Sequence, residues 1–112
     1  MIEAEYENFN RNDNEQQMLD IFHRCQFDAK QGNVNAQNKL GELYRYGKGV
    51  IQNYEEAVKC YQMAADQGLI IALYNLGDMY LRGDGVEKDY KEAVKCYLVA
   101  ADLSHGEGCL NV

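Results

Sequence analysis

The sequence lacks several features that would assign it to common classes of protein. It contains no run of about 18 apolar residues, so no segment is expected to span a membrane. Residues 1–5 are acidic, and no basic stretch followed by an apolar one opens the chain, so we expect no secretory signal. Lysine and arginine number 11 against 18 aspartates and glutamates, and the net charge of −7 argues against binding to nucleic acid.

Proline is absent, and cysteine is scarce, with 4 residues among 112. Cys60 and Cys96 are separated by one period of the repeat described below, so they occupy equivalent places. Stacked helices lie roughly 8–10 Å apart, whereas a disulfide requires Cα atoms within about 4.4–6.8 Å. We therefore expect free thiols, a reducing compartment and a cytoplasmic location.

The chain contains an internal repeat with a period of 36 residues. Residues 36–66 are written a second time as residues 72–102, and the matched segments are Leu40-Gly41 with Leu76-Gly77, Tyr44 with Tyr80, 47–50 with 83–86, 56–61 with 92–97, and 64–66 with 100–102. Periods of 20–50 residues are typical of solenoids and arrays, in which each unit buries its apolar face against the next. The repeat therefore decides the architecture.

Helical spacing of the apolar residues and the absence of a strand pattern predict an all-α fold. We expect an α/α superhelix, a solenoid of antiparallel helical hairpins with about five helices. Its predicted parts are a flexible acidic arm at 1–13, a degenerate half-repeat with one helix at 14–33, full repeats at 34–69 and 70–105, and a truncated third repeat at 106–112.

Within a repeat, the two helices are predicted from their end signals. The first runs from about Val34 to Tyr46, and the glycines of residues 47–50 supply a tight turn. Asn53, followed three residues later by Glu56, is the predicted N-cap of the second helix, which runs to about Gln67. Gly41 lies inside the first helix, which indicates a close approach by another backbone.

These repeated residues resemble the Sel-one-like repeat family, helical-hairpin relatives of the tetratricopeptide repeats. The family pattern is roughly A-x-x-x-L-G-x-x-Y-x-x-G-x-G-V, followed by a second helix with an aromatic residue and a paired alanine. AQNKLGELYRYGKGVIQNYEEAVKCYQMAADQG matches it nearly throughout, and the second unit matches with Ser104 in place of the last glycine. One departure is that Cys60 and Cys96 stand where an aromatic residue is usual. The resemblance implies a superhelical scaffold that binds other proteins and implies no catalysis.

The concave surface formed by the first helices is the predicted partner-binding site. In the first repeat it would present Asn35, Asn38, Glu42, Arg45 and Tyr46; in the second, Ile71, Tyr74, Asp78, Leu81 and Arg82. Arginines would pair with carboxylates, and leucine with isoleucine would give an apolar seat for a peptide or helix. The alternative is a solvated polar face with its two apolar residues packed on neighbouring helices.

The last helix is more apolar than its counterpart. Gln62, Met63 and Gln67 of the first repeat become Leu98, Val99 and Leu103. A terminal repeat should instead turn polar. We therefore predict a self-association surface here, giving a homodimer through the C-terminal repeat, or a truncated array.

Chemistry at the cysteines and histidines is not predicted. His23 and Cys25 lie two apart on a helix and point in different directions, and the cysteines are too dispersed to converge on zinc. The glycine turns lack the strand-loop-helix context of a phosphate-binding loop. We expect no catalytic residue, metal or cofactor. The favoured function is a protein-interaction scaffold; the alternative is a regulatory or anchoring subunit of an enzyme complex, docking through its apolar C-terminal end.

Overall fold

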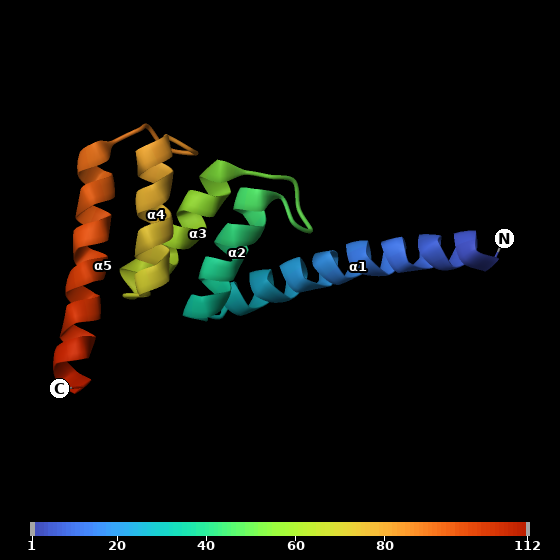
Figure 1. The fold of residues 1–112 in the computed structure, drawn as a ribbon, viewed down its shortest axis with the longest axis horizontal. Coiled ribbons are helices and arrows are strands. Elements are labelled where there is room, and N and C mark those ends of the chain that lie inside the picture. The colour runs from blue at the N-terminus through green and yellow to red at the C-terminus, as the bar shows by residue number, and fades with distance from the viewer. Residues whose placement is uncertain (1, 112) are drawn as a thin grey trace.

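The computed structural model describes the backbone of residues 2–111 and the side chains of residues 14–105. Within residues 2–111 it contains five α-helices and no strand (Figure 1). The helices are α1 (Ile2–Lys30), α2 (Val34–Tyr46), α3 (Tyr54–Asp66), α4 (Ile70–Arg82) and α5 (Tyr90–Asn111). The predicted all-α fold is confirmed.

The helices pack in chain order into an elongated array. α2 lies between α1 and α3, and α4 lies between α3 and α5. The chain measures 60 × 35 × 25 Å, and α1 extends away from the other helices at one end (Figure 1). Leu40 and Leu76 are both buried, as are Ala64 and Ala100, so residues one period apart occupy the same place in successive units. This is the arrangement of a solenoid.

Capping residues set the helix ends inside each repeat. Gly47 and Gly83 adopt left-handed backbone with φ of 67° and 73°, and their N–H groups donate to carbonyls of the last turn. At the next helix start, the Asn53 side chain accepts from the N–H of Glu56 at 3.1 Å. Asp89 accepts in the same way from Glu92 at 3.1 Å. The N-cap predicted at Asn53 is therefore present, and Asp89 forms the equivalent cap in the second repeat.

Gly41 and Gly77 make room for an aromatic ring. A Cβ added to Gly41 would lie 2.7 Å from Cδ1 and Cε1 of Tyr61, and one added to Gly77 would lie 2.7 Å from Cε1 of Tyr97. The expected close approach by a backbone is thus replaced by a tyrosine ring from the second helix of the same hairpin. The missing side chains let the two helices of each hairpin close over that ring.

The loops within the repeats bind each hairpin to the helix before it. Gly49 lies against the backbone of Met18 in α1, and Gly85 lies against the backbone of Tyr54 in α3. Both glycines have positive φ, 74° and 73°. Any side chain at these two positions would collide with backbone, which cannot rotate away, so glycine is required twice over.

The outer helices extend beyond their predicted lengths. α1 begins at Ile2 rather than near residue 14, and α5 continues past Gly106 to Asn111 without a turn. Gly32 and Gly68 follow the ends of α1 and α3 with φ of 93° and 88°, whereas Ser104 takes this place in α5. Without a glycine to adopt left-handed backbone, the helix continues. The arm at 1–13 and the third repeat at 106–112 fall outside the residues whose side chains are described, and they stay predictions.

Candidate interaction surfaces

The ten residues predicted to bind a partner divide between α2 and α4 and differ in burial. Exposed are Asn35, Tyr46, Ile71, Tyr74, Leu81 and Arg82; half-buried are Glu42 and Asp78; buried are Asn38 and Arg45. Asn38 already serves the stack, because its Oδ1 accepts a 3.1 Å hydrogen bond from Nδ2 of Asn75 in α4. The two helices therefore present both polar and apolar side chains to solvent.

A second buried amide joins three helices beside Asn38. Nε2 of Gln37 donates to the carbonyl of Ala29 in α1 at 3.2 Å, and its Oε1 accepts from Nε2 of Gln67 at 2.6 Å. Since both ends of the Gln37 amide are used, its burial costs little. These polar contacts fix the register between successive helices.

Arg45 is a buried cation at the centre of the predicted site. Only 7% of its surface is exposed. Its guanidinium lies 5.4 Å from the centre of the Tyr46 ring, a cation–π contact. Among the described side chains it forms no ion pair; those present join Arg24 to Asp28, Lys39 to Glu42 and Lys59 to Glu56. Burial lowers the pKa of Arg45, but the neighbouring Tyr61 hydroxyl and, more weakly, Tyr46 and Asp78 raise it overall.

Two tyrosine hydroxyls that the sequence analysis did not assign to a site lie close to the predicted residues Asp78 and Arg45. The hydroxyl of Tyr97 donates to Oδ1 of Asp78 at 2.6 Å, and burial together with this bond raises its pKa to about 12. The hydroxyl of Tyr61 is buried, and it has no hydrogen-bond partner meeting geometric criteria among the described residues. Burial raises its pKa to about 12 as well, against the opposing effect of nearby Arg45. The glycines at 41 and 77 were the signal in the sequence, since they mark where each ring crosses the first helix.

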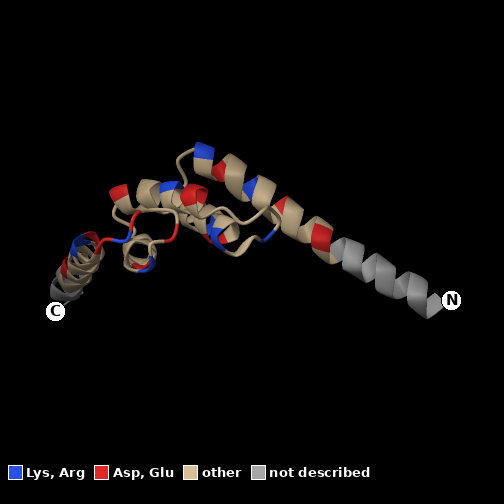
Figure 2. Ribbon diagram, turned by 90° about the horizontal axis from the view of Figure 1, so that it is seen from above, with Lys and Arg blue, Asp and Glu red and all other residues tan. Residues whose placement is uncertain are grey.

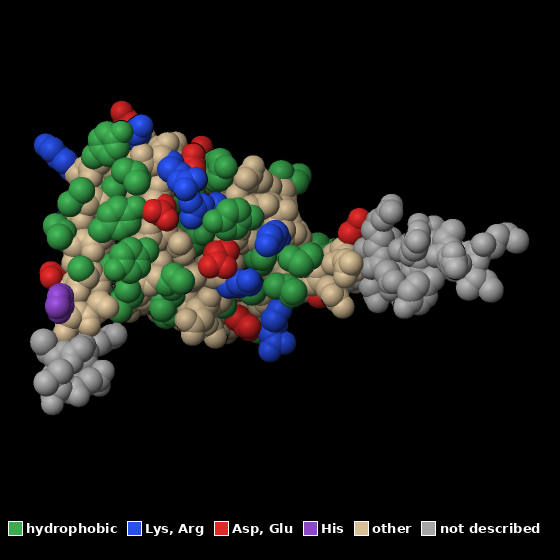
Figure 3. Space-filling view, in the orientation of Figure 1, with side chains coloured by type: hydrophobic (Ala, Val, Ile, Leu, Met, Phe, Trp, Pro, Cys, Tyr) green, Lys and Arg blue, Asp and Glu red, His purple; other side chains and the backbone are tan. Residues whose placement is uncertain are grey.

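Apolar side chains gather over α4 and α5 (Figure 3). On α4 the exposed ones are Ile71, Tyr74 and Leu81. Basic and acidic residues are interspersed along the helices in the described part of the chain (Figure 2). The surface thus combines an apolar area with isolated charges.

The three residues of the predicted self-association surface are exposed on α5 but do not form one patch. Leu98 is 60% exposed and lies one turn after Val94, which is 53% exposed. Val58, one period before Val94, is only 9% exposed, because α4 packs against it. Val99 instead lines a groove between α3 and α5, and Leu103 lies one turn beyond it. The apolar end of the stack is therefore the Val94–Leu98 side of α5.

Two equivalent grooves are present, one between α1 and α3 and the other between α3 and α5. One, of about 300 Å³, is lined by Gln26, Ala29, Lys30, Leu40, Tyr44, Glu56, Lys59, Cys60 and Met63. The other, of about 200 Å³, is lined by the residues one period later, together with Leu73. A cysteine lines each groove at the same position of the repeat, Cys60 in the first and Cys96 in the second. Burial raises the pKa of the Cys60 thiol to about 11 and also raises that of Cys96, which keeps both protonated.

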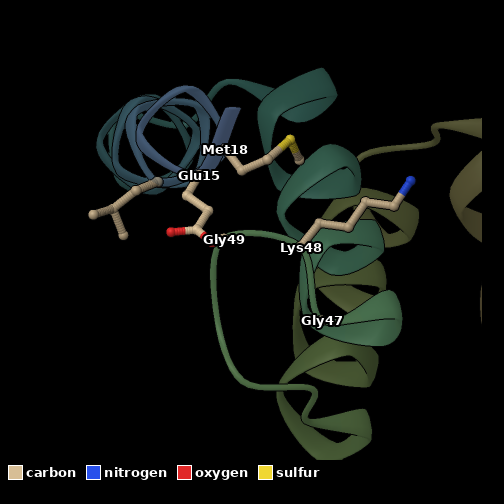
Figure 4. Close-up of a pocket in the computed structure, with 6 residues that line it drawn as sticks. Glu15, Met18, Gly47, Lys48 and Gly49 are labelled. Carbon is tan, nitrogen blue, oxygen red and sulfur yellow. The ribbon is translucent and has the colours of Figure 1, made fainter. Parts of the chain in front are cut away.

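A third hollow, of about 570 Å³, opens between α1 and the loop after α2 (Figure 4). Met18 and the backbone of residues 47–49 form much of its lining, and Glu15 points into it. Cys25, Cys60 and Cys96 are free thiols, and residues 14–105 contain no cluster of three metal-ligating side chains. No helix in the described part of the chain combines the length and the apolar character that a membrane crossing requires.

Comparison with known proteins places the chain among helical repeats. Its structure resembles a protective antigen from uropathogenic Escherichia coli strains described as displaying an SLR fold, with 46% identity and a TM-score of 0.65 over 66% of this chain and 16% of that one. It also resembles a Sel1 repeat protein from Oxalobacter formigenes, with 43% identity and a TM-score of 0.61 over 62% of this chain and 29% of that one. Cysteine rich protein B of Helicobacter pylori is 26% identical, with a TM-score of 0.71 over 81% of this chain and 68% of its own.

A comparison with curated proteins found no match. Among the solved structures, the chain spans only a small part of the length of the first two that it resembles. Residues 34–69 and 70–105 each match the Sel1 repeat, and together they make up more than half of the sequence. The chain therefore belongs to the Sel1 repeat family.

Proposed function

We propose that this chain is a protein-interaction scaffold that binds a peptide or helix of a partner protein on the surface formed by α2 and α4. The Sel1 repeat family generally supplies scaffolds for protein–protein interaction. Binding relies on the shape and charge of a preformed surface, and no bond is made or broken. Helix-in-groove recognition needs an apolar seat bordered by polar groups that fix orientation.

The observation that carries this proposal is the exposure of large apolar residues on a helix held rigidly on both sides. Ile71, Tyr74 and Leu81 are exposed, although α4 is packed between α3 and α5. Tyrosine and leucine at such a position give contact area at little cost in conformational entropy. Arg45, Asp78 and Arg82 lie on the same two helices and supply charge.

The test is to select twelve-residue peptides from a random display library on the immobilised chain and to map the bound peptide by NMR chemical-shift changes. We expect the largest changes at α2 and α4. The variant Tyr74→Ala/Leu81→Ala should lose at least tenfold in affinity, as expected for the anchors of an interface. Changes confined to α1 or α5, with full affinity in this variant, would refute the proposed surface.

A second candidate is docking through the Val94–Leu98 side of α5, either to an enzyme that the chain would regulate or anchor, or to a second copy. The contrast between Val58 and Val94 favours it, because one period earlier the same valine is covered by α4. Exposed apolar surface at the end of a solenoid normally marks an interface.

Sedimentation velocity separates the self-association form of this candidate from a monomeric scaffold. We expect a concentration-dependent shift to dimer for the natural chain and none for Leu98→Glu. Met63→Glu, in the equivalent helix, is the matched control and should leave the shift unchanged. A single monomer species up to high micromolar concentration would refute the dimer.

A further inference from the structure

Tyr61 and Tyr97 occupy equivalent positions, but only one of them has a complete hydrogen bond. The hydroxyl of Tyr97 donates to the Asp78 carboxylate at 2.6 Å. The hydroxyl of Tyr61 is equally an O–H donor, is wholly buried, and has no acceptor among the described residues. Leaving a buried donor without an acceptor costs about 1–3 kcal/mol, and most native proteins avoid it.

Arg45, which lies near Tyr61, is also a buried donor without an anionic acceptor among the described residues. It stands where the second repeat has Leu81, and it is nearly as deeply buried as the core residues. No side-chain hydrogen bond from its guanidinium to an anion is present among residues 14–105. The guanidinium carries five N–H donors and the neighbouring hydroxyl carries one O–H donor. Neither group has an anionic acceptor among the described residues.

The charged groups that face this pair do not neutralise it. Glu42, on α2, lies 3.8 Å from Lys39. Asp78, on α4, accepts a hydrogen bond from the Tyr97 hydroxyl, and Arg82 lies near that tyrosine. The charge of Glu42 is offset by Lys39, and the charge of Asp78 offsets only one of the two arginines, Arg45 and Arg82. One positive charge therefore remains without a negative partner.

A single carboxylate fits what is missing. Its two oxygens offer about four acceptor positions, enough for a forked bond from the guanidinium and one from the hydroxyl. Its charge of −1 matches the one positive charge left over, whereas the additional charge of a phosphate would be repelled by Asp78 and Glu42. The exposed Tyr74 and Leu81 on α4 can seat an apolar residue of the same segment.

We propose that Arg45 and Tyr61 form a carboxylate-binding site, which takes an aspartate or glutamate side chain of an amphipathic partner segment. This proposal rests on the proposed function of the α2–α4 surface and specifies its partner chemistry. The rim tyrosine, Tyr46, holds the guanidinium in place through its ring.

The experiment uses peptides selected on the full chain from the random twelve-residue library. We expect one position to be enriched in aspartate or glutamate. Replacing that residue by its amide should weaken binding roughly tenfold or more, the effect of losing a hydrogen bond between charged groups. Selection on Arg45→Met should yield peptides without this enrichment.

Matched variants separate the site from general effects of charge and folding. Arg24→Met removes the same charge from exposed α1 and should leave affinity unchanged. Arg45→Lys should recover only part of the affinity, because an ammonium cannot make the forked bond. Tyr61→Phe should weaken the acidic peptide several-fold while leaving its amide analogue unaffected.

Each outcome decides between the proposals. Peptides that bind α2 and α4 without an acidic preference would overturn the carboxylate site and keep the proposed function. Tighter binding of a phosphoserine version of the peptide would also overturn it. A library that yields no binder would contradict both. Circular dichroism of each variant confirms that it is folded before its affinity is compared.

Discussion

The two full repeats share one interior and differ in what they present outside it. Leu40 and Leu76, Gly49 and Gly85, and Asn53 and Asp89 perform the same task one period apart. The surface positions diverge: a buried arginine in the first repeat is an exposed leucine in the second, and Gln62 becomes Leu98. Packing restricts the residues that hold the stack, whereas the outward positions are free to specialise for a partner.

The largest effect should come from the glycines that seat each repeat on the helix before it. Gly85→Ala and Gly49→Ala should each lower the free energy of unfolding by about 2–5 kcal/mol, because left-handed backbone and a clash with main-chain atoms both penalise a Cβ. Urea unfolding followed by circular dichroism measures the loss. Gly68→Ala, with positive φ but open space around it, is the control and should lose less. Equal losses in all three would contradict the contacts with Met18 and Tyr54.

Removing the equivalent tyrosine hydroxyls of the two repeats should change the free energy of unfolding by different amounts. Tyr97→Phe should cost about 1.5–3 kcal/mol, because Asp78 loses the donor to its partly buried carboxylate. Tyr61→Phe should leave the free energy of unfolding unchanged or raise it, since the hydroxyl has no acceptor to lose. Paired urea titrations at pH 7 compare the two variants. A large loss in Tyr61→Phe alone would mean that its hydroxyl is satisfied within the fold.

The valines one period apart should respond differently to truncation. Val58→Ala should lower stability by about 1.5 kcal/mol, the value of burying two methylene equivalents. Val94→Ala should change it by less than about 0.5 kcal/mol in dilute protein, since half of its side chain faces solvent. Thermal unfolding at low and high protein concentration tests both, and a cost for Val94→Ala that appears only at high concentration would indicate self-association.

The smallest difference concerns the thiols of the two grooves. At pH 8 Cys60 should react with iodoacetamide roughly a hundredfold more slowly than a thiol of the unfolded chain, because its pKa is raised to about 11 from 9.0 and only the thiolate reacts. Cys96 is 8% exposed against 3% for Cys60, so it should react faster than Cys60. Mass spectrometry of digested samples gives both rates, and reversal of this order would contradict the structure.

Much of the fold follows from the sequence because local signals agree with the period. The bounds of α2 are as predicted, α3 ends one residue earlier than predicted, and the caps at Gly47 and Asn53 are where their residue types place them. The outer helices were predicted less well. There the pattern of a neighbouring repeat is missing, and the replacement of a terminal glycine by Ser104 changed the path of the chain.

The helices that carry the ten residues predicted to bind a partner follow from the sequence, but the burial of those residues does not. The 36-residue period assigns five of them to α2 and five to α4, where they lie in the structure. The burial of Asn38 and Arg45 depends on contacts with other helices, such as the bond from Asn75 of α4 to Asn38, and a helical wheel carries no information about such contacts. The contribution of Tyr61 and Tyr97 requires knowing that each ring passes through the gap left by a glycine.

The seats beneath Gly49 and Gly85 have a consequence for how the protein is made. Each loop rests on a helix that precedes it in the chain, α1 for the first and α3 for the second. During translation, each of these helices is therefore synthesised before the loop that packs against it, and the units can fold in the order of their synthesis.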